Sequence, residues 1–361
     1  MKRGILGFVR TDIKDRFIYR LKLNEFTKIA KGAGYEILDE VVQTSEKIDP
    51  SYVFGKGKVE ELKILANRLQ IDSLIMYNTL NSMQKINLED YLGLSVLDRY
   101  DLILEIFDQN AGDAISKLQI ELARLERMIP YVRKRASILY FRDRPGPRSL
   151  GEYGYHRTIA QLLKRKKKIR EKLEKYRYLK EIQREKRREL GVLVFTLCGF
   201  YGAGKTTLFN ALTNLKKEIK GIPFTTLSSK SFLIKYSGME LIVIDTIGFA
   251  FDIDPILIKS FEVTLEDLRD ADYDLLILDA SDEEQLFKAK LDTSLEILNK
   301  LEINKEKILP VLNKTDLIDK EELISKMNIV EEKINKEPIY ISAFYKYNID
   351  KLLNSILSKK I

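Results

Sequence analysis

The chain has almost none of the residues from which zinc clusters and nucleophilic active sites are usually built. Its 361 residues include one cysteine (Cys198), one histidine (His156) and no tryptophan. This excludes an internal disulfide framework, Cys/His zinc clusters and the usual Cys–His or Ser–His catalysis. A single cysteine also suits a reducing compartment, so we expect a cytoplasmic protein. Cys198 lies in an apolar run and is expected in the core, whereas His156 is expected to be solvated.

Long apolar runs are also missing. No stretch reaches the roughly 18 apolar residues of a membrane-spanning helix, so we predict no membrane span. The first ten residues are too short an apolar run for a signal peptide and favour a strand. A hydrophobic content of 45% with 32% charged residues is typical of a globular protein, and the length allows two or three domains.

The net charge of +8 is concentrated in one segment. Residues 133–190 hold 21 Lys and Arg against 7 Asp and Glu, so the rest of the chain is net negative. Such a segment is typical of proteins that bind a polyanion, RNA in the first instance. A solvated, lysine-rich helix face is the alternative, and composition does not separate the two.

One motif organises the chain. Residues 199–207 read Gly-Phe-Tyr-Gly-Ala-Gly-Lys-Thr-Thr, follow an expected buried strand (192–198) and open an expected helix (208–212), as in the phosphate-binding pattern G-x-x-x-x-G-K-[ST]. Glycines let successive N–H groups turn toward phosphate oxygens, and the helix start adds its positive dipole end. The predicted phosphate-binding residues are Gly199, Phe200, Tyr201, Gly202, Ala203, Gly204, Lys205, Thr206 and Thr207.

Further candidates follow later strands. Asp245 ends the strand expected at 240–244, and Gly248 can place its N–H on a γ-phosphate. We predict that Mg²⁺ is held by Thr206, Thr226 and Asp245. Lys205, Thr226 and Gly248 are the predicted catalytic residues, and the segment with Phe224, Thr225 and Thr226 would order when the γ-phosphate is present.

A base-selecting pattern follows the strand expected at 308–312. Asp316 can accept hydrogen bonds from two guanine N–H donors that adenine lacks, which would disfavour adenine by a factor on the order of 10⁴. The Lys314 stem would lie over the base, and Asn313 would tie its loop to the phosphate loop. Ser342 and Ala343 follow the strand expected at 338–341 and would supply an N–H to the guanine oxygen. Four motifs in this order predict a GTP-binding protein.

Phe249 stands where many GTPases have a glutamine that orients the attacking water. Phenylalanine cannot polarise water, so we expect slow intrinsic hydrolysis. A gating role for Phe249 and simple packing beneath the loop both remain open.

The rest of the chain predicts an α/β protein of three parts. Residues 1–110 alternate expected strands (4–10, 35–43, 71–77, 94–98) with expected helices, which indicates a parallel α/β domain. Residues 111–190 predict a basic antiparallel helical hairpin, resembling a coiled coil, with a glycine-rich tip near 146–154. Residues 191–361 predict the P-loop GTPase domain.

The hairpin prediction depends on two apolar stripes. Positions spaced three and four apart in 115–132 form a seam for another helix, and a second stripe lies in 155–190. The first stripe consists of Ile115, Leu118, Leu122, Leu125, Ile129 and Val132. The second consists of Leu162, Ile169, Leu173 and Tyr176.

The sequence resembles the HflX family of translational GTPases over nearly its whole length. The resemblance lies in residues 49–62, 97–107 and 117–123, in Asp-Thr-Ile-Gly-Phe at 245–249 and in Asn-Lys-Thr-Asp at 313–316. It implies an α/β domain with a helical hairpin, a Ras-like GTPase domain, binding to the large ribosomal subunit and its rRNA, and separation or rescue of ribosomes under stress. We expect no carboxyl-terminal extension of the kind found in many bacterial members, and this expectation with the Lys/Ile-rich composition suggests an archaeal member.

We therefore predict a monomeric GTPase that binds GTP, GDP and Mg²⁺ and associates with ribosomes. One alternative is a GTP-gated switch whose hairpin docks on a protein and not on the ribosome. A further hypothesis places a second nucleotide, such as ATP, at Gly55-Lys56-Gly57-Lys58, although a turn that caps a helix is the simpler interpretation.

Overall fold

The computed structural model describes residues 2–11, 18–143, 150–215, 230–254, 257–258 and 261–358. The chain forms two compact units. The amino-terminal unit comprises residues 1–109 and 117–175, and the carboxyl-terminal unit comprises 110–116 and 176–361. The predicted division into three domains stays a prediction. No helix in the described part of the chain is long and apolar enough to cross a membrane.

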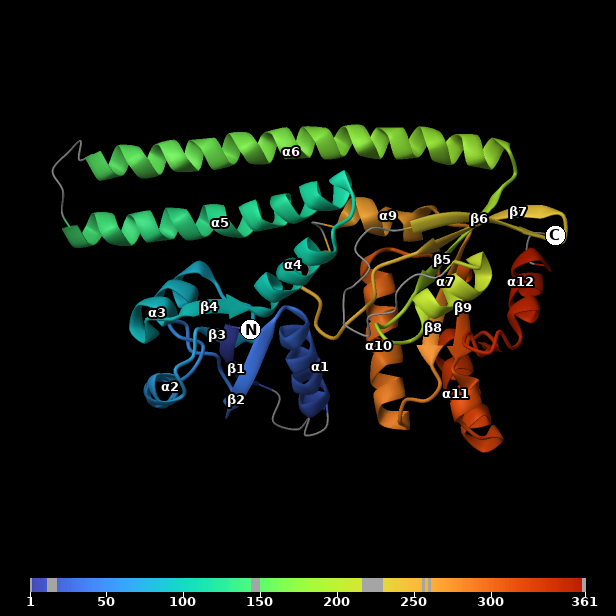
Figure 1. Cartoon of the computed structure of the whole chain (residues 1–361), viewed down its shortest axis with the longest axis horizontal. Coiled ribbons are helices and arrows are strands. Elements are labelled where there is room, and N and C mark those ends of the chain that lie inside the picture. Colours follow the sequence, from blue (N-terminus) through green and yellow to red (C-terminus); the bar gives the residue numbers. More distant parts are fainter. Residues whose placement is uncertain are drawn as a thin grey trace. The chain divides into compact units, whose positions relative to one another are not determined.

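The amino-terminal unit contains a four-stranded sheet of order β2-β1-β3-β4, and all its neighbouring strands are parallel. Its strands alternate with helices along the chain, as predicted from the alternating patterns (Figure 1). The elements are β1 (Lys2–Arg10), α1 (Ile18–Gly32), β2 (Tyr35–Thr44), α2 (Lys56–Leu69), β3 (Ser73–Met76), α3 (Ser82–Leu92), β4 (Ser95–Asp98) and α4 (Arg99–Asn110).

The core of this unit lies between the sheet and the helices that follow β2 and β3. Ile5, Leu74 and Met76 of the strands form one buried cluster with Val59 and Leu62 of α2. Removing such a buried side chain typically costs 2–5 kcal/mol. The apolar stripe of α2 therefore fixes the helix to the sheet.

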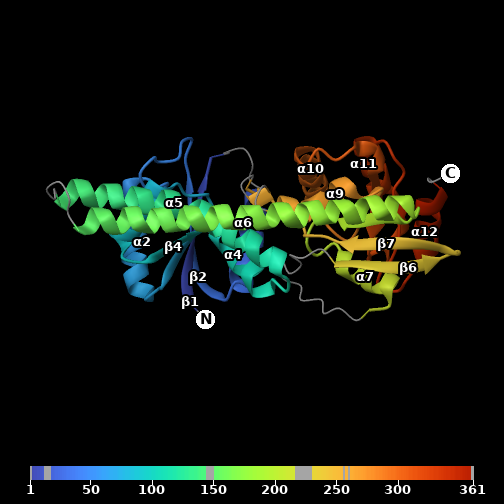
Figure 2. The ribbon, with the colours of Figure 1, turned by 90° about the horizontal axis from the view of Figure 1, so that it is seen from above.

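Two long helices follow, α5 (Ala114–Asp143) and α6 (Leu150–Glu189). They run side by side in opposite directions in both views (Figures 1 and 2). The predicted stripes face inward, because Leu122, Leu125, Ile129, Ile169 and Leu173 are buried and the other stripe residues are half-buried. The described helices thus form the predicted antiparallel pair. Of the predicted tip, residues 146–149 lie outside the described residues, and residues 150–154 are helical as the start of α6, so the prediction of a non-helical tip over 150–154 was wrong.

The carboxyl-terminal unit contains a six-stranded sheet of order β10-β9-β8-β5-β7-β6. All neighbouring strands are parallel except β6, which is antiparallel to β7. The strands are β5 (Leu193–Cys198), β6 (Lys230–Tyr236), β7 (Met239–Asp245), β8 (Tyr273–Asp279), β9 (Ile308–Asn313) and β10 (Ile339–Tyr340). The helices are α7 (Lys205–Thr213), α9 (Glu262–Asp270), α10 (Glu284–Lys300), α11 (Lys320–Ile334) and α12 (Ile349–Ser358), with short 3-10 turns η1 (Lys305–Lys307) and η2 (Thr315–Leu317).

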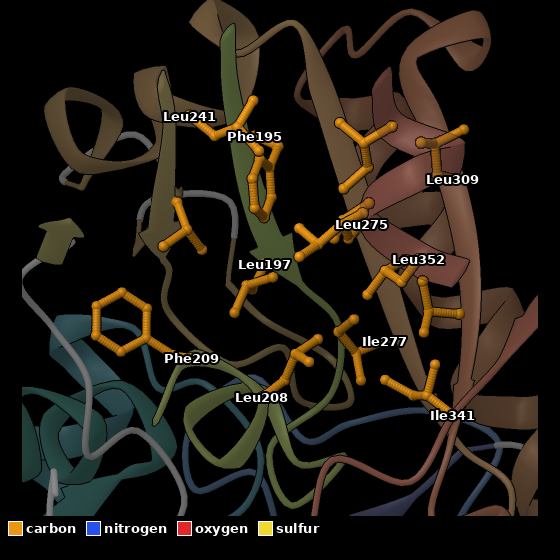
Figure 3. Packing of buried hydrophobic residues seen from close by; sticks show 14 of the residues in the cluster. Phe195, Leu197, Leu208, Phe209, Leu241, Leu275, Ile277, Leu309, Ile341 and Leu352 are labelled. Atoms are coloured by element: carbon orange, nitrogen blue, oxygen red, sulfur yellow. The ribbon is translucent and has the colours of Figure 1, made fainter. Parts of the chain in front are cut away.

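Alternate residues of the central strands build the core of this unit. Phe195 and Leu197 of β5 and Ile277 of β8 pack with Leu208 of α7 and Leu352 of α12 in one buried cluster (Figure 3). Because successive strand residues point to opposite faces, this cluster occupies one face of the sheet. Helices α9, α10 and α11 lie on the other side (Figure 2).

The strand order places the ligand edge beside β5. The chain passes from β5 to β7 on one side and then to β8 on the other, so the direction of winding changes at β5. Parallel sheets of this kind bind ligands at the carboxyl ends of the strands next to such a point. The segment after Cys198, the last residue of β5, is therefore where a ligand is expected.

Candidate functional site

The loop after β5 has the backbone of a phosphate-binding loop. Gly199, Gly202 and Gly204 have φ angles of 125°, 78° and 92°, a region that L side chains rarely adopt. A Cβ atom at Gly199 would lie 2.3 Å from the Ile277 carbonyl oxygen. The three glycines are therefore required by conformation, and at Gly199 by space as well. Gly204 is the N-cap of α7, so the loop ends on the positive end of a helix.

Lys205 turns back over this loop. Its Nζ donates to the carbonyl oxygens of Gly199 (2.8 Å) and Phe200 (2.7 Å), and the residue is 7% exposed. Burial lowers the pKa of Lys205 to about 8. A phosphate group beside this ammonium would favour its charged form. The site is therefore suited to an anion.

The remaining loop residues lie around Lys205. Phe200 is buried, with its ring 4.9 Å from that of Phe251, and Ala203 is buried in the core cluster. Tyr201 is half-buried, and Thr206 and Thr207 lie in the first turn of α7. All nine predicted phosphate-loop residues thus lie at the carboxyl end of β5.

Thr206 and Asp245 meet at the mouth of the loop. The Thr206 hydroxyl donates to Oδ2 of Asp245 at 3.4 Å, and Asp245 is fully buried at the end of β7. Hydroxyl and carboxylate oxygens are ligands that Mg²⁺ accepts, with phosphate oxygens and water completing its shell. No three His, Cys, Asp or Glu side chains gather as a metal site within the described ranges. These two oxygens therefore fit a metal that also takes ligands from a nucleotide.

Gly248 lies against the phosphate loop. A Cβ atom there would lie 3.2 Å from Lys205 Nζ and 3.2 Å from Tyr201 Cα. The next residue pairs with the loop through its main chain: Phe249 N–H donates to the Gly199 oxygen (2.9 Å), and Tyr201 N–H donates to the Phe249 oxygen (3.0 Å). Because Gly248 has no side chain, its backbone can lie this close to Lys205 and Tyr201.

The Phe249 side chain is 2% exposed. It is thus buried in the core and points away from water, while its main chain is bonded to the phosphate loop. The structure confirms the packing of Phe249. Whether the residue also gates the site stays a prediction.

Asn313 joins three loops, and its bond to the phosphate loop is the one that the sequence predicted. Its Nδ2 donates to the Ala203 oxygen (2.8 Å), and its Oδ1 accepts from Ala343 N–H (2.9 Å). Gly204 lies so close that a Cβ atom there would be 2.2 Å from Asn313 Nδ2. The phosphate loop and the segments after β9 and β10 are therefore held together by one buried amide.

The N–H groups predicted to contact the guanine oxygen, those of Ser342 and Ala343, have partners within the protein. The Ala343 N–H donates to Asn313 in this structure. Ser342 N–H donates to the Tyr347 oxygen. The guanine contact of this pair stays a prediction.

The other base-selecting residues lie in and beside η2. Asp316 is exposed, so a base can reach its carboxylate, and Lys314 begins the turn with a left-handed φ of 62°. The Lys314 ammonium forms an ion pair with Asp279, the last residue of β8. Sequence reasoning missed Asp279. Its position at the end of a buried strand was the available signal.

Three predicted residues, Phe224, Thr225 and Thr226, lie outside the described residues. Their roles in the nucleotide and Mg²⁺ sites stay predictions. The other predicted site residues gather at the carboxyl ends of β5, β7, β9 and β10, which share one edge of the sheet.

The second candidate, residues 55–58, has a different geometry. Gly55 has an ordinary extended backbone and donates its N–H to Oε1 of Gln43 (3.0 Å). Lys56 is exposed, and Lys58 pairs with Glu61 at 2.7 Å. This segment caps α2.

The basic run on α6 divides into two faces. Arg165 pairs with Glu121 (2.5 Å) and Lys166 with Glu126 (3.2 Å), so these side chains join α6 to α5. Lys164, Lys167, Lys168, Lys172 and Lys175 are exposed. We call these five residues the lysine stripe. The sequence predicted one basic segment and did not distinguish the exposed lysines from those that pair with α5.

Comparisons with known proteins agree with this geometry. Residues 20–108 match a family described as GTP-binding GTPase N-terminal, and residues 194–314 match one described as 50S ribosome-binding GTPase. GTPase HflX of Thermofilum pendens is 39% identical over 310 residues, which is 86% of this chain and 73% of the relative. GTPase HflX of Methanocaldococcus jannaschii is 34% identical over 95% of this chain and 84% of the relative.

A solved structure matches along the whole chain. The complex of SsGBP with GDP is 27% identical, has a TM-score of 0.55, and the match covers 99% of this chain and 98% of that one.

Proposed function

Because this chain belongs to the HflX family of GTPases, we propose that its nucleotide site controls an association with the large ribosomal subunit. The chain is a GTP-binding GTPase. The observation that carries the proposal is the coincidence of a phosphate loop, an Asp–Thr pair and the Asn313 loop at one sheet edge, together with a lysine stripe on α6.

The predicted hydrolysis uses groups already in place. Lys205 and the loop N–H groups would bind the phosphates and stabilise charge on the transferred group. Mg²⁺ held at Thr206 and Asp245 would neutralise charge on the phosphate oxygens. Gly248 N–H would contact the γ-phosphate. Phe249 offers no group that orients water, so intrinsic hydrolysis is expected to be slow unless a partner supplies one.

The main-chain pairing of Phe249 supports a link between nucleotide and conformation. Its N–H and oxygen bond to Gly199 and Tyr201 of the phosphate loop. A γ-phosphate at Gly248 would act on this same short segment. GTP and GDP would therefore favour different arrangements of residues 249–254.

The lysine stripe supports a nucleic-acid partner. Its five lysines are exposed, and Lys167 forms an ion pair with Glu171 of the same helix at 4.0 Å, whereas the neighbouring Arg165 and Lys166 are paired with α5. Exposed lysines on a helix suit a phosphate backbone, and such binding weakens steeply as salt rises. The match of residues 194–314 to the 50S ribosome-binding GTPases makes rRNA the favoured polyanion.

Charge reversal on the stripe tests this proposal. Lys164→Glu, Lys167→Glu and Lys168→Glu together should reduce co-sedimentation with large ribosomal subunits by at least about 10-fold at low salt, since several phosphate contacts are lost. Nucleotide affinity should not change. A triple reversal at the exposed Lys305, Lys320 and Lys351 changes net charge equally and should leave sedimentation intact.

Two outcomes would contradict the proposal. Equal losses in both triple variants would mean that net charge alone acts. A partner that survives ribonuclease treatment in pull-downs, with no ribosome binding, would favour the GTP-gated protein switch. Separation of subunits is a further proposal, tested by adding the GTP-bound and GDP-bound protein to intact ribosomes.

A further inference from the structure

An ion pair to which the sequence analysis assigned no role lies at the end of β8. Asp279 is the last residue of that strand, is 8% exposed, and stands in register with Asn313 of β9. Ala280 N–H donates to the Asn313 oxygen at 2.8 Å. The end of β8 is therefore fixed directly beside the base-selecting loop.

Both oxygens of Asp279 are used. Oδ1 accepts from the N–H (3.0 Å) and the hydroxyl (2.6 Å) of Ser281, while Oδ2 receives the ammonium of Lys314. The Ser281 bonds set the orientation of the carboxylate. The carboxylate in turn sets where the Lys314 ammonium lies.

The other end of Lys314 is fixed as well. Its backbone lies between Asn313, whose amide is bonded to two loops, and the turn η2, at φ 62° and ψ 33°. The methylene stem is thus anchored at both ends. A free lysine samples many rotamers, and ordering it on binding opposes affinity.

We propose that Asp279 is a positioning residue for purine recognition, which holds Lys314 stretched so that its stem presents an apolar face to the base. The inference rests on the proposed guanine site at Asn313, Lys314 and Asp316. In this proposal Asp316 discriminates between bases. Asp279 orders the Lys314 stem in advance, so that any purine can stack on it.

These separate roles of Asp279 and Asp316 predict different effects of their variants on GDP and IDP affinity. Asp279→Asn should weaken GDP and IDP by the same factor, about 3- to 10-fold, because both purines use the stem. The ratio of GDP to IDP affinity should stay unchanged, since IDP lacks only the amino group that Asp316 reads. Asp316→Ala should lower that ratio.

A double-mutant cycle separates positioning from a general structural role. In a Lys314→Met background the stem has no ammonium to hold, so Asp279→Asn should have no further effect on GDP affinity. A carboxylate that merely stabilises the loop would weaken binding equally with or without the lysine. Asp101→Asn is the control: it breaks a carboxylate–lysine pair with Lys85 (2.7 Å) in the other unit and should leave affinity unchanged.

Calorimetric titration of the full chain with Mg·GDP and Mg·IDP supplies these values, and thermal denaturation without nucleotide checks folding. Additive effects in the cycle, a changed GDP-to-IDP ratio in Asp279→Asn, or no effect of that variant would overturn the inference while leaving the guanine site intact. If the unaltered protein fails to bind GDP, the proposed function itself fails.

Discussion

Two glycine- and lysine-containing segments lead into the first turn of a helix in this chain, and their geometries differ. Residues 199–205 have three left-handed glycines and a buried lysine, while residues 55–58 have an extended glycine and an exposed lysine. Both sequences look similar in composition. A phosphate site therefore depends on the backbone turning its N–H groups inward and on a cation held over them. The structure gives residues 55–58 no such arrangement.

Removing each lysine tests this contrast most strongly. Lys205→Met should weaken GTP and GDP binding by at least about 100-fold, because it deletes a buried charge that would contact phosphate. Folding should survive, since methionine fills the space without a buried charge. Lys56→Met, an exposed change, should alter neither GTP nor ATP affinity. Fluorescence titration measures both variants, and loss of binding in Lys56→Met would contradict the contrast.

Replacing one glycine of each segment by alanine should change the stability of the protein in opposite directions. Gly204→Ala places a Cβ atom 2.2 Å from Asn313 Nδ2 at a φ of 92°, so we expect about 10- to 100-fold weaker GDP binding and a loss of about 1–3 kcal/mol of stability. Gly57→Ala meets nothing within 4 Å and lies in α2, so it should gain roughly 0.5–1 kcal/mol. Chemical denaturation measures both. A destabilised Gly57→Ala would show that residues 55–58 are constrained too.

The smallest expected effect is on pH dependence. Burial lowers the pKa of Lys205 to about 8, and a bound phosphate would raise it. Below pH 8 the ammonium is already present, whereas above it binding must take up a proton. GDP affinity should therefore fall by up to about 10-fold per pH unit above 8. In the Lys205→Met variant the GDP affinity should no longer depend on pH in this range. A wild-type GDP affinity that does not change between pH 7 and 9.5 would contradict the assignment of this pH dependence to Lys205.

Much of this architecture follows from sequence patterns. Gly55 precedes α2, and Asn81 caps α3 by accepting a hydrogen bond from Gln84 N–H, so local residue types mark the starts of both helices. Cys198 is buried as expected, and His156 is exposed on α6. These features depend on residues close together in the sequence, so residue type and spacing suffice to predict them.

Other features depend on contacts distant in sequence. The sequence analysis did not predict β6, because Phe232 and Leu233 are exposed and the strand is defined by pairing with β7. Helix α5 continues through Pro130 well beyond the predicted seam, and Arg135 in this extension pairs with Asp90 of α3 at 2.7 Å. Lys166 of the basic segment pairs with Glu126 of α5, a contact that the charge pattern alone did not indicate. The Asp279–Lys314 ion pair joins residues 35 positions apart, which meet because β8 and β9 lie side by side.

The central claim is that one pocket selects a guanine nucleotide through its phosphates and its base. Equilibrium titration of the full chain with fluorescent GDP and ADP in Mg²⁺ tests it most directly. We predict saturable GDP binding and ADP affinity weaker by a factor on the order of 10⁴. Equal affinity for the two nucleotides, or no binding of GDP, would contradict it.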